Sequence, residues 1–112
     1  MKTTTKQEEL DIVDSSGNIY KDLDIRNPEE WATKARLASK LYDIIDARHL
    51  TQIQTAELLG IKQPDVSALR NGHFGKFSVY RLLSFLRVFD QDVDIIIRPK
   101  TRETAHIKVA EA

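Results

Sequence analysis

Residues 51–72, TQIQTAELLGIKQPDVSALRNG, constrain the fold more than any other part of the chain. Thr51 is a favourable helix N-cap, and Gln54 at the third helical position can complete a capping box. Gly60 ends the helix that follows Thr51, because glycine adopts the left-handed conformation of a helix C-terminus at little cost. A second short helix is expected over about 63–70. The segment therefore predicts two short helices separated by a tight turn.

The spacing of small and apolar side chains in this segment is that of a helix-turn-helix. Where two helices cross steeply, only a small residue fits at the contact, and Ala56 occupies that place. Val66 and Leu69 then face back from the second helix toward the first. Two packed helices of an ordinary α-helical domain would carry a similar pattern, so the spacing alone leaves both interpretations open.

Two further helices are predicted on either side of this unit. Asn27 is an N-cap followed by Pro28 and two glutamates, and apolar residues recur on one helical face to about His49. Ser78 caps another helix, expected over Val79 to about Phe89, with an inner stripe of leucines and phenylalanine. The chain is thus expected to be mainly α-helical, with four helices.

A short C-terminal β-strand is predicted after the last helix. Val93, Ile95 and Ile97 alternate with their neighbours until Pro99 ends the pattern. Three parts of the chain follow from these elements. They are an acidic and partly ordered N-terminal arm over 1–26, a helix-turn-helix domain with its terminal strand over 27–99, and a polar C-terminal tail over 100–112.

Composition excludes several classes of protein. The 112 residues contain no cysteine, which rules out a disulfide scaffold and thiolate metal sites. The three histidines share no metal-ligand spacing, and no catalytic constellation is present, so we expect no cofactor, no metal and no enzymatic activity. No apolar run is long enough to span a membrane, and a cytoplasmic location is the default expectation.

Charge is unevenly distributed although 17 basic and 17 acidic residues balance overall. Residues 1–30 hold four basic and eight acidic residues, a balance of −4. A protein that binds DNA only through backbone attraction is usually more basic. With this acidic head, residues 1–30, the chain needs either specific contacts to bind DNA or a second partner that accepts the acidic head.

A polar stripe on the outer face of the second helix of the unit suggests DNA recognition. Gln63, Ser67 and Arg70 are four and three residues apart and share this face. Amide, hydroxyl and guanidinium groups are those that bond to base edges in the major groove or to phosphates. Further phosphate contacts are expected from the front of the unit and from the loop that follows, at Thr51, Gln52, Lys62, His73 and Lys76.

The segment LTQIQTAELLGIKQPDVSALRNG resembles the helix-turn-helix of the xenobiotic-response-element (XRE) family, the Cro/CI-type repressors. The resemblance extends to GNIYKDLDI, NPEEWATKARLASKLYDII and FSVYRLLSFLRVFDQDVDIIIRP, and so covers roughly residues 17–99. These segments are similar to a branch of small HigA-type antitoxins. The resemblance implies a Cro/CI-type domain of four to five helices.

The same resemblance implies a function. In that branch, a dimeric repressor binds operator DNA, and its usual partner is a small ribonuclease toxin of the HigB/RelE type, expected to be basic. Base readout maps onto Gln63, Pro64 and Ser67, and backbone contact onto Gln52, Lys62 and Arg70. Such proteins often have Ser or Thr just before the recognition helix. This chain has Lys62 there, so a weaker helix cap is expected.

The acidic head carries four apolar residues that need a partner. Ile19, Tyr20, Leu23 and Ile25 lie among acids, which suits docking on the basic surface of a ribonuclease. They could equally cover the core of their own domain. Two other functions also remain open at this point, a regulator of the same family without a toxin, and a helical protein–protein adaptor.

A homodimer is expected from the apolar strand. A lone strand is marginal in water, so a second copy is expected to pair with it or to cover it with its last helix. Two recognition helices would then lie about 34 Å apart and read a pseudo-palindromic operator.

Overall fold

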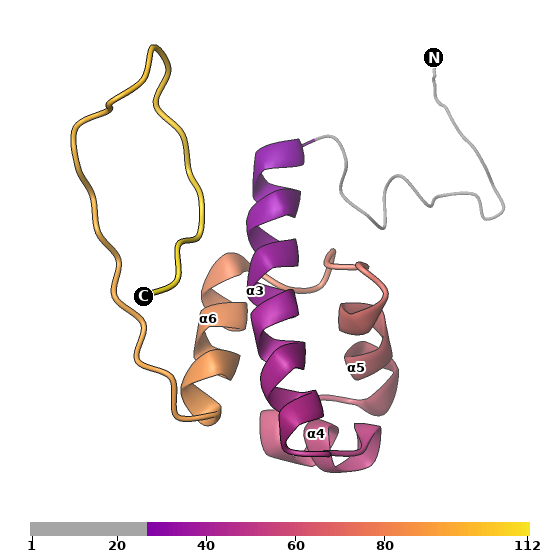
Figure 1. Cartoon of the computed structure of the whole chain (residues 1–112). Helices are drawn as coiled ribbons and strands as arrows, with labels where there is room; N and C mark the ends of the chain where they lie inside the picture. Colours follow the sequence, from indigo (N-terminus) through magenta and orange to yellow (C-terminus); the bar gives the residue numbers. More distant parts are fainter. Residues whose placement is uncertain (1–26) are drawn as a thin grey trace, which may run out of the picture.

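The structure of the chain, a computed structural model, describes residues 27–112 (Figure 1). Helix α3 lies between α5 and α6, and α4 lies at one end of the bundle (Figure 1). The mainly α-helical fold predicted from the sequence is confirmed, and every helix ends within two residues of its predicted bounds. In chain order, the four helices of the described part are α3 (Pro28–Ala47), α4 (Gln52–Leu59), α5 (Gln63–Arg70) and α6 (Val79–Val88).

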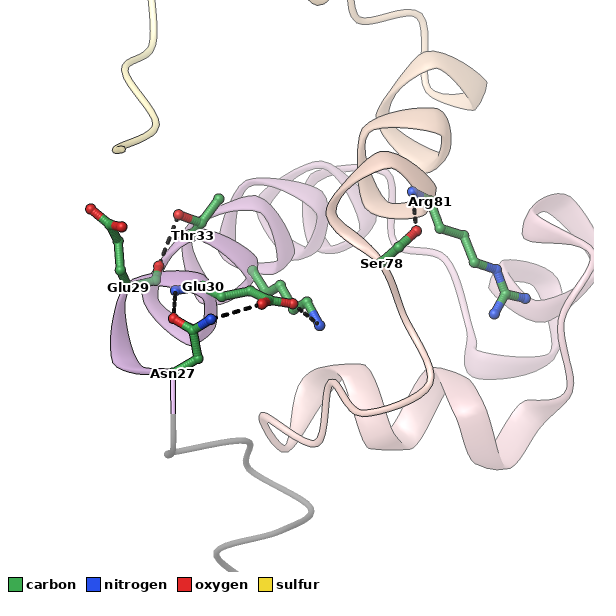
Figure 2. Close-up of polar contacts among 7 residues, drawn as sticks. Asn27, Glu29, Glu30, Thr33, Ser78 and Arg81 are labelled. Carbon is green, nitrogen blue, oxygen red and sulfur yellow. Dashed lines mark hydrogen bonds and ion pairs between the residues drawn. The ribbon is translucent and has the colours of Figure 1, made fainter. Parts of the chain in front are cut away.

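Side-chain caps fix the starts of α3 and α6 (Figure 2). Asn27 accepts a hydrogen bond from the backbone N–H of Glu30 at 3.3 Å, and its own amide donates to the Glu30 carboxylate at 3.2 Å. The same carboxylate forms an ion pair with Lys34 at 3.1 Å. At α6, the Ser78 hydroxyl accepts from the backbone N–H of Arg81 at 3.0 Å. Both caps are those that the sequence predicts.

The end of α3 comes two residues before the predicted one. The helix ends at Ala47 because His49 has a φ of 55°, in the left-handed region. The backbone N–H of His49 still donates to the carbonyl of Asp46 at 3.1 Å, and the backbone N–H of Leu50 donates to the carbonyl of Ile45. The periodicity of the side chains cannot show this reversal, because it is a backbone event.

One hydrophobic core joins all four helices and the loop before α6. Leu82 and Leu86 of α6 are buried as predicted, and so is Phe89, the C-cap residue just after the helix, whereas Leu83 is only partly buried. Phe85 is buried in addition, with its ring edge-on to Phe77 at a centroid distance of 5.9 Å. The other large buried apolar residues are Leu37, Leu41, Ile45, Leu59, Val66, Leu69 and Phe74.

The predicted C-terminal strand does not form in the part of the chain that the structure describes. Residues 93–97 have no regular secondary structure, and the alternation of buried and exposed side chains expected there is absent beyond Val93. The physical reason is that a strand needs a neighbour for its backbone hydrogen bonds. No other segment within 27–112 provides one.

The polar tail over 100–112 returns to α3 instead of trailing away. The chain runs out beyond the helices as a long open loop and turns back (Figure 1). On its way back, the backbone N–H of Ile107 donates to the Glu29 carboxylate at 2.8 Å. Glu111 then pairs with Lys40 at 3.1 Å and with Arg36 at 3.5 Å. The lysine lowers the pKa of Glu111, by hydrogen bonding and by its charge.

A partner contact was expected for four residues that lie outside the described part of the chain, Ile19, Tyr20, Leu23 and Ile25.

Of the helices that the structure describes, none is both long and apolar enough to cross a membrane.

Candidate DNA interface

The contact between α4 and α5 has the geometry that the small-residue spacing predicts. Ala56 and Val66 are buried where the two helices meet, and Leu69 continues the inner face of α5. Gly60 has φ +69° and ψ 32°, the left-handed conformation that lets the chain turn sharply. The N–H of Ile61 bonds back to the carbonyl of Ala56 at 3.1 Å. The turn thus holds the start of α5 beside α4.

The start of α4 is closed by the predicted capping box. The Thr51 hydroxyl accepts from the backbone N–H of Gln54 at 3.1 Å, and the Gln54 side chain accepts from the backbone N–H of Thr51 at 2.9 Å. Both groups are exposed. Thr51 therefore serves the helix first, and its hydroxyl hydrogen is what it can still offer to a phosphate.

The first residues of α4 and α5 are joined by their side chains. The amide nitrogen of Gln63 donates to the amide oxygen of Gln52 at 3.3 Å, and both side chains are exposed. Each amide keeps unused groups after this bond, an oxygen and an N–H on Gln63 and the NH₂ of Gln52. The two glutamines thus form one polar surface across the turn, with donors and acceptors that can face base edges or phosphates.

The outer face of α5 presents the other predicted contact residues together. Lys62 is the N-cap and makes no side-chain cap hydrogen bond, as its difference from Ser or Thr predicts. Its ammonium group makes no ion pair with a described residue, and the side chain is exposed. Pro64 is exposed in the first turn, and Ser67 is partly exposed one turn later. The start of α5 is therefore cationic, and its outer face is polar and uncharged.

Arg70 lies differently from its three companions, because α3 holds its side chain. The guanidinium donates to the Asp46 carboxylate at 2.9 Å and lies 4.0 Å from the centre of the Tyr42 ring. One turn earlier on α5, the carbonyl of Val66 accepts a hydrogen bond from the Tyr42 hydroxyl. Arg70 therefore fixes α5 to α3, and only its remaining N–H groups are available to DNA.

Tyr42 and Asp46 were not identified from the sequence as neighbours of α5. They are four residues apart on α3, and the two positions that they bond on α5 are also four apart. Burial raises the pKa of Tyr42, and the charge and hydrogen bond of Arg70 oppose that rise. No local signal in the sequence shows the contact, because the partners are 24 residues apart.

The loop after α5 brings one predicted cation near the interface. The Lys76 ammonium pairs with Asp65, in the first turn of α5, at 3.3 Å, and the lysine side chain stays 75% exposed. His73 is exposed, and its imidazole makes no hydrogen bond with a described residue. The loop itself is held by Trp31, whose indole N–H donates to the carbonyl of Gly72 at 3.3 Å.

Residues 27–112 contain no group of three or more His, Cys, Asp or Glu side chains placed to hold a metal ion. The groups gathered on the surface of α4 and α5 are amides, hydroxyls and an ammonium group, which form hydrogen bonds and ion pairs. A short helix with an exposed polar face, preceded by a cation and steadied from behind, can enter a major groove.

Comparisons with known proteins agree with this geometry. A family described as "Helix-turn-helix domain" matches residues 19–98. A solved structure described as "Putative XRE Family Transcriptional Regulator" is 46% identical, covers 77% of this chain and 97% of its own, and has a TM-score of 0.67. A protein named "Putative antitoxin HigA2" from Mycobacterium tuberculosis is 34% identical over 61 residues, which is 54% of this chain. The match spans 60% of that relative's length.

Proposed function

This chain belongs to the helix-turn-helix domain family and is a transcriptional regulator of the XRE type, and we propose that it represses its own operon by binding an operator as a homodimer. The observation that carries the proposal is the joined pair of amides, Gln52 and Gln63, at the front of α4 and α5. Helix α5 is then the recognition helix, with base readout by Gln63, Pro64 and Ser67.

Phosphate contacts complete the proposed interface. Lys62 precedes the helix and Lys76 lies beside its first turn, so both ammonium groups can reach the backbone on the two sides of a groove. Thr51 and Gln52 present donors at the N-terminus of α4, where free backbone N–H groups also attract a phosphate. His73 and the remaining N–H groups of Arg70 are further proposed phosphate contacts.

We further propose that the chain is the antitoxin of a toxin–antitoxin pair and neutralises a small basic ribonuclease of the HigB/RelE type. Two observations support this. One is the likeness to the protein named "Putative antitoxin HigA2". The other is the net charge of −4 over residues 1–30. DNA repels this negative charge, whereas a basic RNA-binding surface attracts it. The proposed contact residues are Ile19, Tyr20, Leu23 and Ile25.

Two measurements on the full chain test the two halves of this proposal. Fluorescence anisotropy with the DNA upstream of its own gene, against a shuffled duplex of the same composition, tests the repressor. We expect tighter binding to the upstream DNA, and equal binding to both duplexes would overturn operator recognition.

A growth assay tests the antitoxin, with the product of a neighbouring gene for a small basic protein as the candidate toxin. We expect the full chain to restore growth, and a variant with all four proposed contact residues changed to alanine to fail while its DNA binding is unchanged. Operator binding with no rescue by the unmodified chain would leave a regulator of the same family without a toxin. Full rescue by the alanine variant would place the contact elsewhere.

A further inference from the structure

The segment after α6 exposes apolar side chains in succession. Ile95, Ile96 and Ile97 are 75%, 71% and 92% exposed, and Ile107 on the returning limb is 68% exposed. Large apolar side chains gathered in this way mark an interaction surface. In addition, no backbone–backbone hydrogen bond joins residues 92–112 to the rest of the described chain. The three isoleucines and the backbone of residues 92–98 therefore lack a partner among the described residues.

The two ends of this segment are nevertheless held. Val93 and Val109 pack against the hydrophobic core. The backbone N–H of Ile107 bonds to Glu29, and Glu111 pairs with Lys40. The unpartnered residues are thus presented from a fixed base on α3 and α6. An extended surface of this kind is suited to pairing with another strand.

The charges along residues 90–100, DQDVDIIIRPK, indicate what that other strand is. Three acids precede the isoleucines, and two bases, Arg98 and Lys100, follow them. The pattern is complementary to its own reversal about Ile95. Two copies laid antiparallel therefore bring acid opposite base at both ends, whereas a parallel pair in the same register would set acid beside acid.

We propose that a second copy of this chain pairs with residues 92–98 in an antiparallel ribbon centred on Ile95. The proposal deepens the homodimer of the proposed function and rests on it. Ile95 lies opposite its own counterpart, Val93 opposite Ile97, and Asp92 opposite Arg98, each pair occurring twice except the first. Pro99 has no N–H and ends the ladder.

Pairing in this register also covers Ile97, the most exposed of the three isoleucines. Val93 is packed against the core of its own chain. Ile97 of the second copy becomes its direct neighbour across the ribbon and so reaches the edge of that core. The backbone groups of residues 92–98 gain cross-strand hydrogen bonds at the same time. This is the strand that the alternation of Val93, Ile95 and Ile97 predicts, completed only by a second chain.

Single cysteines in the full chain test the register, because the natural sequence has none. Directly opposed residues of an antiparallel pair have Cα atoms about 4.5–5.5 Å apart, within the range of a disulfide. We expect Ile95→Cys to form a disulfide-linked dimer under mild oxidation. Ile96→Cys is the matched control, since this neighbour is similarly exposed but lies diagonally from its counterpart. Equal cross-linking of both variants, or none by Ile95→Cys, would overturn the proposal.

A charge exchange tests the antiparallel direction independently. Asp92→Arg and Arg98→Asp each replace attraction by repulsion at both ends of the ribbon, and should each weaken self-association by about tenfold. Mixing the two variants should restore a dimer with one copy of each, because every opposed pair is then complementary. Sedimentation of labelled mixtures reads this directly. Two single variants that dimerise normally, or a mixture that stays monomeric, would overturn the proposal.

Operator binding by the same variants separates this inference from the proposed function. Variants that no longer dimerise but still prefer operator half-site DNA to a shuffled duplex support the ribbon and leave recognition intact. If the natural chain is dimeric and prefers the operator, but Ile95→Cys forms no cross-link and the two charge variants form no mixed dimer, the ribbon alone is refuted.

Discussion

The side-chain amide of Gln63 donates to the side-chain oxygen of Gln52 at 3.3 Å, so the first residues of α5 and α4 bond to each other across the turn. Each glutamine alone is a long side chain with several rotamers. The bond restricts both, which lowers the entropy that either loses when it binds DNA. The proposed recognition surface is therefore formed jointly by the two helices, which leads to the first prediction.

Replacing Gln63 by alanine should weaken operator binding by about 1–3 kcal/mol and relax one base position. The loss should be much smaller on a shuffled duplex, because Gln63 meets there only by chance the base that it contacts in the operator. Anisotropy titrations on both duplexes measure the two effects. Gln7→Ala, a glutamine outside the helix-turn-helix, is the matched control and should change neither. Equal losses on both duplexes for the Gln63 variant would show that this residue reads no base.

Replacing Lys62 by alanine should weaken binding to every sequence alike. A lysine that neutralises one phosphate releases about one counterion, so the slope of log K against log salt should fall by about 1. Titrations at several salt concentrations give this slope. A loss confined to the operator, with an unchanged slope, would contradict the assignment of Lys62 to the backbone.

Gly60→Ala should destabilise the domain by about 1 kcal/mol, through backbone conformation alone. The glycine has φ +69°, and a Cβ added there would meet no atom within 4 Å. Urea unfolding should show this loss, a smaller one for Gly60→Asn, and little change for Gly75→Ala, whose φ is not positive. A large loss for Gly60→Ala would mean that steric crowding is present after all.

Tyr42→Phe should remove about 0.5–1.5 kcal/mol of stability, because the bond to the carbonyl of Val66 is lost. Burial raises the pKa of Tyr42 above its ordinary value of 10.0 in the folded state. The stability that the raised pKa supplies is therefore complete below pH 10 and is lost as pH rises through the folded-state value. From pH 8 upward, the melting temperature should fall more steeply with pH for the natural chain than for the variant. Parallel curves would contradict a raised pKa at the partly buried Tyr42.

The sequence predicts the four described helices because their signals are local. Thr51 with Gln54, Gly60, and Asn27 with Glu30 act within one turn of backbone, and each forms the contact expected of it. The polar outer face of α5 is likewise a matter of spacing along one helix. The weak cap at Lys62 was predictable for the same reason, since a cap is a contact between near neighbours.

Tertiary structure decided what distant residues do. Arg70 belongs to the polar stripe by spacing, yet Asp46 and Tyr42 turn it toward α3, and this depends on how two helices pack. The tail over 100–112 reads as polar and solvent-exposed, yet Glu111 returns to Lys40. Val93, Ile95 and Ile97 show the limit most clearly. Their alternation encodes one face of a strand, but a strand exists only where a second backbone supplies hydrogen bonds, and that partner is not local in sequence.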